Sequence, residues 1–202
     1  MGAGAGLVLS AAIVSYALWT TPTPLHPALS GSSRPAPAPG EDFEPPALAE
    51  GSLEFPVLLL SRVRLQDSFR HPRANGERTH HAVDIMAPRY TPVRAVSDGV
   101  ITRASDTGAG GRALYQVDPT GGYCFYYAHL EGYAPGVEVG RKVRRGEVIG
   151  YVGSTGNAPE SAPHLHFAIY QLRDRKRWWG GRPVNPYPLL KLSAHLDADR
   201  PS

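Results

Sequence analysis

The chain has 202 residues and a formal net charge of +3, and this length accommodates one domain of ordinary size. Its single cysteine, Cys124, excludes an intramolecular disulfide. Outside residues 173–179, Lys and Arg form no run with interleaved aromatic residues, so we recognise no nucleic-acid-binding motif and predict no nucleic-acid partner.

The N-terminal segment, residues 1–20, is an uncharged apolar run. Its most hydrophobic part, residues 7–19, has the length of a signal-peptide core, and the whole run is close to the shortest span that crosses a bilayer. No Lys or Arg precedes it, and a buried N-terminal helix is the alternative. We predict a signal peptide or a membrane anchor, and therefore an exported protein.

Residues 21–54 are rich in Pro, Ala and Ser, and we predict a flexible linker. The run Pro35–Gly40 favours an extended, semi-rigid conformation. Thirty residues of this kind reach on the order of 90 Å at about 3.1 Å each, which is long enough to hold a domain well away from a membrane. Residues 193–202 are expected to be a disordered tail.

Residues 55–192 are predicted to fold as one compact domain that is mostly β, with antiparallel sheets. Short apolar and aromatic runs alternate with turn residues, which is typical of strands and hairpins. The predicted strands span residues 92–96, 100–103, 113–117 and 123–128, and residues 143–152 continue the same pattern of short strands and turns. Asp98-Gly99 and residues 118–122 are the predicted hairpin turns, and Pro186–His195 is a candidate helix. Cys124 falls in a strand and is expected to be a buried apolar side chain.

The spacing of His164 and His166 places both imidazoles on one face of a strand, because residues i and i+2 share a face. Leu165, Phe167 and Ile169 then point the other way, into the core. The two histidines are about 6.6 Å apart along such a strand. Two exposed strand histidines without a ligand role are the alternative.

His80 and Asp84 are a second pair of candidate ligands, four residues apart. An extended chain separates their Cα atoms by roughly 13 Å, whereas zinc bonds are only about 2 Å long. Val83 and the following Pro88 favour a strand over a helix. We therefore predict that His80 lies in a loop, that a strand begins near Ala82, and that the chain bends there.

Two other histidines are harder to assign. His81 competes with His80, although its spacing of three from Asp84 puts it on the opposite face of a regular strand. His129 ends a strand-like segment, where a lone histidine is usually polar surface. Imidazole and carboxylate together are the ligands of hydrolytic zinc sites, in which three protein ligands leave one position for a reactive water.

Several separated segments, taken in order, resemble the lysostaphin-type (LytM-like) zinc metallopeptidase family, which includes cell-wall endopeptidases. The resemblance covers about residues 63–187 and depends on the whole set of segments. The matching segments are His80-x-x-x-Asp84, Ala87-Pro88-x-x-Thr91-Pro92-Val93, Ser97-Asp98-Gly99-Val100, Tyr127-Ala128-His129-Leu130, residues 146–156 and Pro163-His164-Leu165-His166-Phe167. One departure is Ala82, where many members of the family have Gly.

The resemblance implies a lipoyl-like, β-barrel-related fold and a Zn²⁺ cofactor. It implies that His80, Asp84 and His166 hold the zinc, while His129 and His164 act in catalysis without binding it. The implied function is hydrolysis of peptide bonds in peptidoglycan stem peptides or cross-links. Combined with the apolar N-terminus, this places the protein outside the cytoplasm of a bacterium, in the envelope or periplasm, and attached to the inner membrane.

Other functions stay open on the sequence alone. A non-hydrolytic peptidoglycan-binding or hydrolase-activating module of the same fold is the main alternative. The β-rich pattern also suggests a lipoyl or biotinyl carrier. Such a carrier needs a modifiable lysine in a hairpin turn, and Lys142 does not have this setting. Trp178 and Trp179 are expected to pack against the domain, although stacking on glycan is the alternative. The sequence predicts no oligomeric state.

Overall fold

The computed structural model describes residues 45–58, 64–73, 76–106, 108–174 and 177–190. The strands in this part of the chain are β1 (Arg64–Leu65), β2 (Pro72–Arg73), β3 (Arg78–Thr79), β4 (Val83–Met86), β5 (Pro92–Arg94), β6 (Gly99–Asp106), β7 (Arg112–Val117), β8 (Tyr123–Tyr133), β9 (Lys142–Val143), β10 (Val148–Val152), β11 (His164–Gln171) and β12 (Arg182–Val184). Residues 186–190 are helical, where the sequence predicts a short helix.

The predicted signal peptide or anchor, most of the predicted linker and the C-terminal tail lie outside the described residues. Within the described residues, no helix has the length and hydrophobicity needed to cross a membrane.

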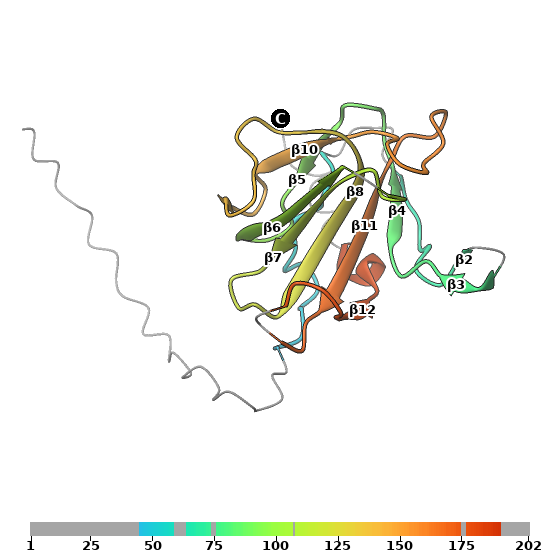
Figure 1. Ribbon diagram of the computed structural model, residues 1–202. Helices are drawn as coiled ribbons and strands as arrows, with labels where there is room; N and C mark the ends of the chain where they lie inside the picture. Colours follow the sequence, from blue (N-terminus) through green and yellow to red (C-terminus); the bar gives the residue numbers. More distant parts are fainter. Residues whose placement is uncertain (1–44, 59–63, 74–75, 107, 175–176, 191–202) are drawn as a thin grey trace, which may run out of the picture. The chain divides into compact units, whose positions relative to one another are not determined.

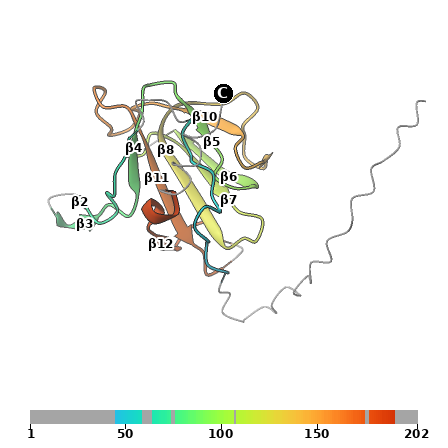
Figure 2. The same ribbon diagram turned by 180° about the vertical axis from the view of Figure 1, so that it is seen from behind.

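A ten-stranded antiparallel sheet dominates the fold, with the order β1-β4-β11-β8-β7-β6-β9. Figure 1 shows its central strands β4, β11, β8, β7 and β6 side by side. β10 joins it by pairing with both β5 and β8, and β12 pairs with β11. The strands β2 and β3 form a separate two-stranded hairpin that projects beside β4, as the reverse view also shows (Figure 2). The prediction of a mostly β fold built from antiparallel sheets is confirmed.

Apolar residues at every second position of the central strands form the core. On β11, Leu165, Phe167 and Ile169 are fully buried, as predicted from the period of two. Phe167 packs against the rings of Phe125 and Tyr127 on the neighbouring β8, with centroid distances of 6.5 and 5.2 Å. Removing a buried ring of this kind costs about 3–5 kcal/mol, so this cluster is a main source of stability.

The segment before β1 also belongs to the core. Leu53, Phe55 and Val57 are buried in the main hydrophobic cluster. The hydroxyl of Tyr123 donates a hydrogen bond to the carbonyl of Pro46 at 3.0 Å. Residues 45–58, including the end of the predicted linker, therefore pack on the β domain.

One predicted hairpin is confirmed. β7 and β8 pair in antiparallel fashion across the turn at residues 118–122. Asp118 stabilises this turn because its Oδ1 accepts the backbone N–H groups of Gly122 at 2.8 Å and Tyr123 at 2.7 Å. A local side-chain acceptor of this kind is readable from sequence.

The hairpin predicted at Asp98-Gly99 is wrong, because β5 pairs with β10 while β6 pairs with β7 and β9. The Asp98 carboxylate accepts the backbone N–H of Arg145 at 2.8 Å, so it caps a turn far along the chain and not its own. At Gly99 an added Cβ would lie 2.4 Å from the Val117 carbonyl oxygen, so glycine is needed here because β6 and β7 approach each other closely.

Residues 142–152 form two short strands with a turn between them, in line with the predicted pattern. A turn separates β9 from β10, with Glu147 N–H donating to the Arg144 carbonyl at 3.0 Å. Gly146 in this turn has φ of 81°, a left-handed conformation that favours glycine.

Candidate active site

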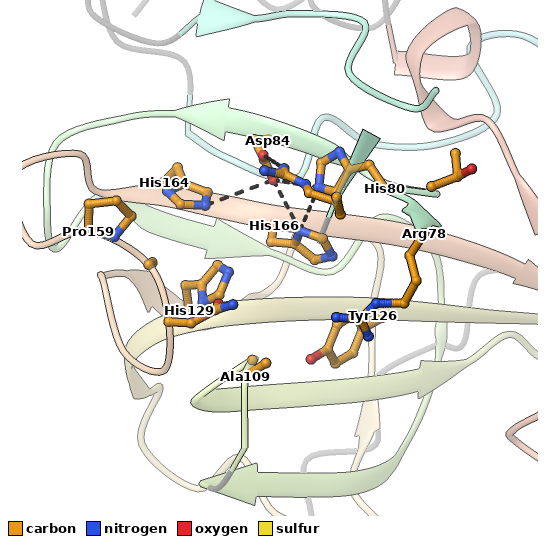
Figure 3. Close-up of a pocket in the computed structure, with 14 residues that line it drawn as sticks. Arg78, His80, Asp84, Ala109, Tyr126, His129, Pro159, His164 and His166 are labelled. Carbon is orange, nitrogen blue, oxygen red and sulfur yellow. Dashed lines mark hydrogen bonds and ion pairs between the residues drawn. The ribbon is translucent and has the colours of Figure 1, made fainter. Parts of the chain in front are cut away.

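A cavity of about 520 Å³ opens on the face of the sheet beside β4, β8 and β11 (Figure 3). It is lined by Arg73, Arg78, Thr79, His80, Asp84, Ala109, Gly110, Tyr126, His129, Asn157, Ala158, Pro159, His164 and His166. All five site residues predicted from the sequence lie on its wall.

His80 lies in the loop between β3 and β4, and the chain bends next to it as predicted. The bend is at His81, which has φ of 55°, a left-handed conformation uncommon for a residue with a side chain. His81 is exposed and its ring lies 5.6 Å from that of Phe69, outside the residues that line the cavity. The buried His80 Nδ1–H donates to the carbonyl of Ser68 at 3.0 Å, which fixes the ring.

Strand register brings Asp84 and His166 together. β4 and β11 are antiparallel neighbours, and Asp84 stands directly opposite His166. Directly opposed residues project to the same face, here the cavity face. Asp84 is also held from behind, because its backbone N–H donates to Ser68 Oγ at 3.1 Å.

The three ligand atoms form a nearly equilateral triangle. His80 Nε2 lies 3.0 Å from His166 Nδ1 and 3.1 Å from Asp84 Oδ1, and His166 Nδ1 lies 3.0 Å from Asp84 Oδ1. A point equidistant from all three is about 1.8 Å from each atom, so bonds of about 2.0–2.1 Å reach one ion just outside their plane. The donor set and its spacing therefore fit Zn²⁺.

The protonation pattern also favours a cation at this point. Because His80 Nδ1 carries the proton given to Ser68, its Nε2 has a lone pair and no proton in the neutral ring. Asp84 Oδ1 is also an acceptor, so His80 Nε2 and Asp84 Oδ1 face each other with their lone pairs at 3.1 Å. A metal ion placed between these atoms converts the repulsion into two bonds.

The electrostatics of the group keep Asp84 ionised. Burial alone raises the pKa of Asp84, but its close contacts with His166 and His80 outweigh burial and hold the pKa well below its usual range. Burial lowers the pKa of His166, against the opposing effect of Asp84. A carboxylate and neutral imidazoles are the protonation states that bind zinc.

His129 and His164 lie on the wall beside this triangle. Their ring centroids are 4.9 Å apart, and the His129 ring lies 5.6 Å from that of His166. His129 Nδ1–H donates to the Thr155 carbonyl and His164 Nδ1–H to the Ala162 carbonyl, both at 2.8 Å. Each neutral ring therefore has an unprotonated Nε2, and burial lowers the pKa of His129 to about 4.

Comparison with known proteins identifies the family of the chain. The model of peptidase family M23 matches residues 78–186. The chain belongs to peptidase family M23. This confirms the resemblance seen in the sequence, and the match includes all five predicted site residues.

Individual M23 relatives span the same region. The chain is 38% identical over 138 residues to the DD-carboxypeptidase/endopeptidase Mpg of Neisseria meningitidis serogroup B, covering 68% of this chain and 29% of that protein. It is 32% identical over 147 residues to the L-Ala–D-Glu endopeptidase of Bacillus subtilis, covering 70% and 44%. Among solved structures, the lytM protein of Ruminococcus gnavus superposes with a TM-score of 0.60 at 33% identity, covering 70% of this chain and 60% of that one. The chain thus spans less than half the length of these two curated relatives.

Two residues of this M23 site were not singled out in the sequence. Ser68 contacts both His80 and Asp84, and Arg73 donates to Asp84 Oδ2 at 2.5 Å. No local pattern marks either residue, because their contacts depend on how the β2–β3 hairpin and the preceding loop fold over β4. The positive φ of His81, which makes the bend, is equally invisible in the sequence.

Other residues named from the sequence lie partly on the cavity wall and partly away from it. Arg78 and Asn157 line the cavity, whereas Ser161 does not. Trp178 packs edge-on against Tyr115 with a centroid distance of 4.8 Å, as predicted, while the Trp179 side chain is more exposed. Cys124 is buried and unpaired by disulfide, and burial raises the pKa of its thiol to about 12.

Proposed function

We propose that the protein is a zinc metalloendopeptidase that hydrolyses peptide bonds in the stem peptides or cross-links of bacterial peptidoglycan. The observation that carries the proposal is the triangle of His80 Nε2, Asp84 Oδ1 and His166 Nδ1, with edges of 3.0–3.1 Å, on the wall of an open cavity. Membership of family M23, and relatives named for endopeptidase activity, support the substrate class.

His80, Asp84 and His166 hold the metal in this proposal. When bound, Zn²⁺ supplies a Lewis acid that makes a water nucleophilic near neutral pH and polarises the scissile carbonyl. The ligands come from a loop and two paired strands that are anchored in the core, so the chain presents them without rearrangement.

His129 and His164 move the protons. An imidazole with a lowered pKa is neutral at pH 7 and able to accept the proton of the attacking water, and burial gives His129 that property. The same ring, once protonated, or its neighbour His164 4.9 Å away, donates to the leaving amine. A protonated ring also stabilises the negative charge that develops on the carbonyl oxygen.

Digestion of purified peptidoglycan by the purified full chain, with mass analysis of the soluble products, tests the proposal. We expect peptide fragments in the presence of zinc and none after chelation or in a His166→Ala variant. A protein that binds zinc and peptidoglycan yet releases no fragment would instead be the non-hydrolytic module, and the proposal would fall.

The location of the protein is part of the same proposal. Peptidoglycan lies outside the cytoplasmic membrane, so we propose that residues 1–20 direct export or anchoring and that residues 21–54 act as a tether. A fusion of residues 1–54 to a reporter that is active only outside the cytoplasm measures this directly. A reporter that stays inactive would contradict export by this segment.

A further inference from the structure

The β2–β3 hairpin carries two arginines that face each other. Arg73 and Arg78 are direct partners in the antiparallel register, so their side chains project from the same face of the hairpin. Like charges in directly opposed positions destabilise a strand pair. A negative charge nearby therefore stabilises a two-stranded hairpin with this pairing.

Only one of these two cations has such a charge within the described part of the chain. Arg73 Nη2 lies 2.5 Å from Asp84 Oδ2, and about half of the Arg73 side chain is exposed. Arg78 is exposed, lines the same cavity and pairs with none of the described acidic side chains. The Arg78 guanidinium is therefore available to a ligand that enters the cavity.

The charges on the cavity wall also favour an anionic ligand. Two arginines and one aspartate line the cavity, so these three side chains together carry a net charge of +1. Asp84 is already shared between Arg73 and the metal-ligand triangle. A cavity with this balance attracts anionic substrates.

We propose that Arg78, backed by Arg73, binds a free carboxylate of the peptide substrate and so selects anionic stem peptides over neutral peptides. This inference rests on the proposed function and adds the substrate class. Guanidinium and carboxylate make paired, charge-assisted hydrogen bonds, which give both affinity and orientation. Neutral peptides such as polyglycine offer Arg78 no such partner.

The position of Arg78 also fixes where the carboxylate lies. Figure 3 shows Arg78 reaching from β3 toward Tyr126 on one side of the metal-ligand triangle, while His129 and His164 lie on the other. A peptide that places its scissile bond at the triangle therefore carries its anionic group on the Arg78 side. The proton-transfer histidines then face the opposite part of the substrate.

The test uses soluble cross-linked dimers of the stem peptide in three forms: both kinds of carboxylate free, the D-Glu α-carboxyl amidated, or the C-terminal carboxyl amidated. Arg78→Gln removes the charge and Arg78→Lys keeps it without the guanidinium. Arg177→Gln is the control, because Arg177 is 66% exposed and outside the cavity. Each full-length protein is measured twice: by equilibrium titration after zinc removal, and by initial cleavage rates with zinc.

We expect Arg78→Gln to weaken binding of the free dimer, and to raise its KM, by about 10–100-fold, the usual loss for a hydrogen bond to a charged group. One of the two amidated dimers should bind the wild-type protein more weakly by the same factor, and its amidated group identifies the carboxylate that Arg78 binds. The affinity for that amidated dimer should not change further in Arg78→Gln. Arg78→Lys is intermediate, and the control variant matches wild type.

Equal affinities of the three dimers for the wild-type protein would overturn the inference. So would an Arg78→Gln loss of the same size on free and amidated dimers, or an absence of binding by every form. If such a protein still released fragments from whole peptidoglycan in a zinc-dependent manner, the proposed function would stand without the carboxylate site.

Discussion

Ser68 offers a sharp test of how the metal ligands are positioned. Its backbone carbonyl accepts the His80 Nδ1–H at 3.0 Å, and its hydroxyl oxygen accepts the Asp84 backbone N–H at 3.1 Å. β1 pairs with β4 only at Leu65↔Ile85 and Arg64↔Met86, so Asp84 lies one residue beyond this ladder. The Ser68 hydroxyl thus takes the place of the next strand partner.

Ser68→Ala removes only the hydroxyl and leaves the carbonyl that holds His80. The side chain is buried, with 6% of the residue exposed, so the Asp84 N–H loses its acceptor without gaining water. A buried, unsatisfied donor costs about 1–3 kcal/mol. For a domain of this size we expect the melting temperature of the metal-free protein to fall by roughly 3–10 °C. Loss of an outer hydrogen bond that orients a metal ligand lowers metal affinity by about 10–100-fold.

The assay combines thermal unfolding in chelator with zinc titration against a competing chromophoric chelator. Ser52→Ala is the matched control, because the exposed Ser52 hydroxyl donates only to the nearby Ala49 carbonyl at 2.6 Å. We expect that control to stay within about 0.5 kcal/mol of wild type and to bind zinc normally. If Ser68→Ala bound zinc as tightly as wild type, the idea that this hydroxyl positions Asp84 would be refuted.

Three further outcomes are expected. His166→Ala leaves two ligand atoms of the triangle, so stoichiometric zinc binding is lost by metal analysis of the dialysed protein; retained zinc would remove His166 from the ligand set. His129→Gln keeps zinc but lowers kcat on peptidoglycan by at least about 100-fold, the scale of general acid–base catalysis, and full activity would contradict the proton-transfer role. Cys124, with its thiol pKa raised to about 12, resists alkylation by iodoacetamide at pH 8 in the native protein and reacts after unfolding, as mass spectrometry can show; rapid native labelling would contradict its burial.

The sequence predicted those parts of the fold whose signals are local. The β7–β8 hairpin was predictable because Asp118 and the glycines that make its turn lie between the two strands they connect. The pairing of β5 with β10 was not, because it joins strands more than fifty residues apart in the chain. Asp98 looked like a turn residue for its own neighbours, and its carboxylate instead caps the turn at Arg145.

The candidate site follows the same division. The period of two on β11 predicted that His164 and His166 face one way, and the distance argument predicted a bend beside His80. The residues that position the metal ligands through hydrogen bonds were not predictable. Ser68 and Arg73 reach Asp84 because the β2–β3 hairpin and the loop before it fold over β4, and nothing in their neighbouring residues marks them.

The hydrophobic core fixes the spacing of the metal ligands. On β4 and β11 the residues beside Asp84 and His166 form inward pairs, Ile85 with Leu165 and Val83 with Phe167, and all four side chains are fully buried. A slip of β4 by one residue against β11 would turn Val83 and Ile85 toward the cavity and solvent, at about 1.5–3 kcal/mol each. The sum for these two side chains, about 3–6 kcal/mol, is a large fraction of the whole stability of a typical domain. The same alternation that buries the core therefore holds Asp84 opposite His166 before any metal arrives, so the ligand positions do not depend on the ion for their formation, unlike small domains that fold only around zinc.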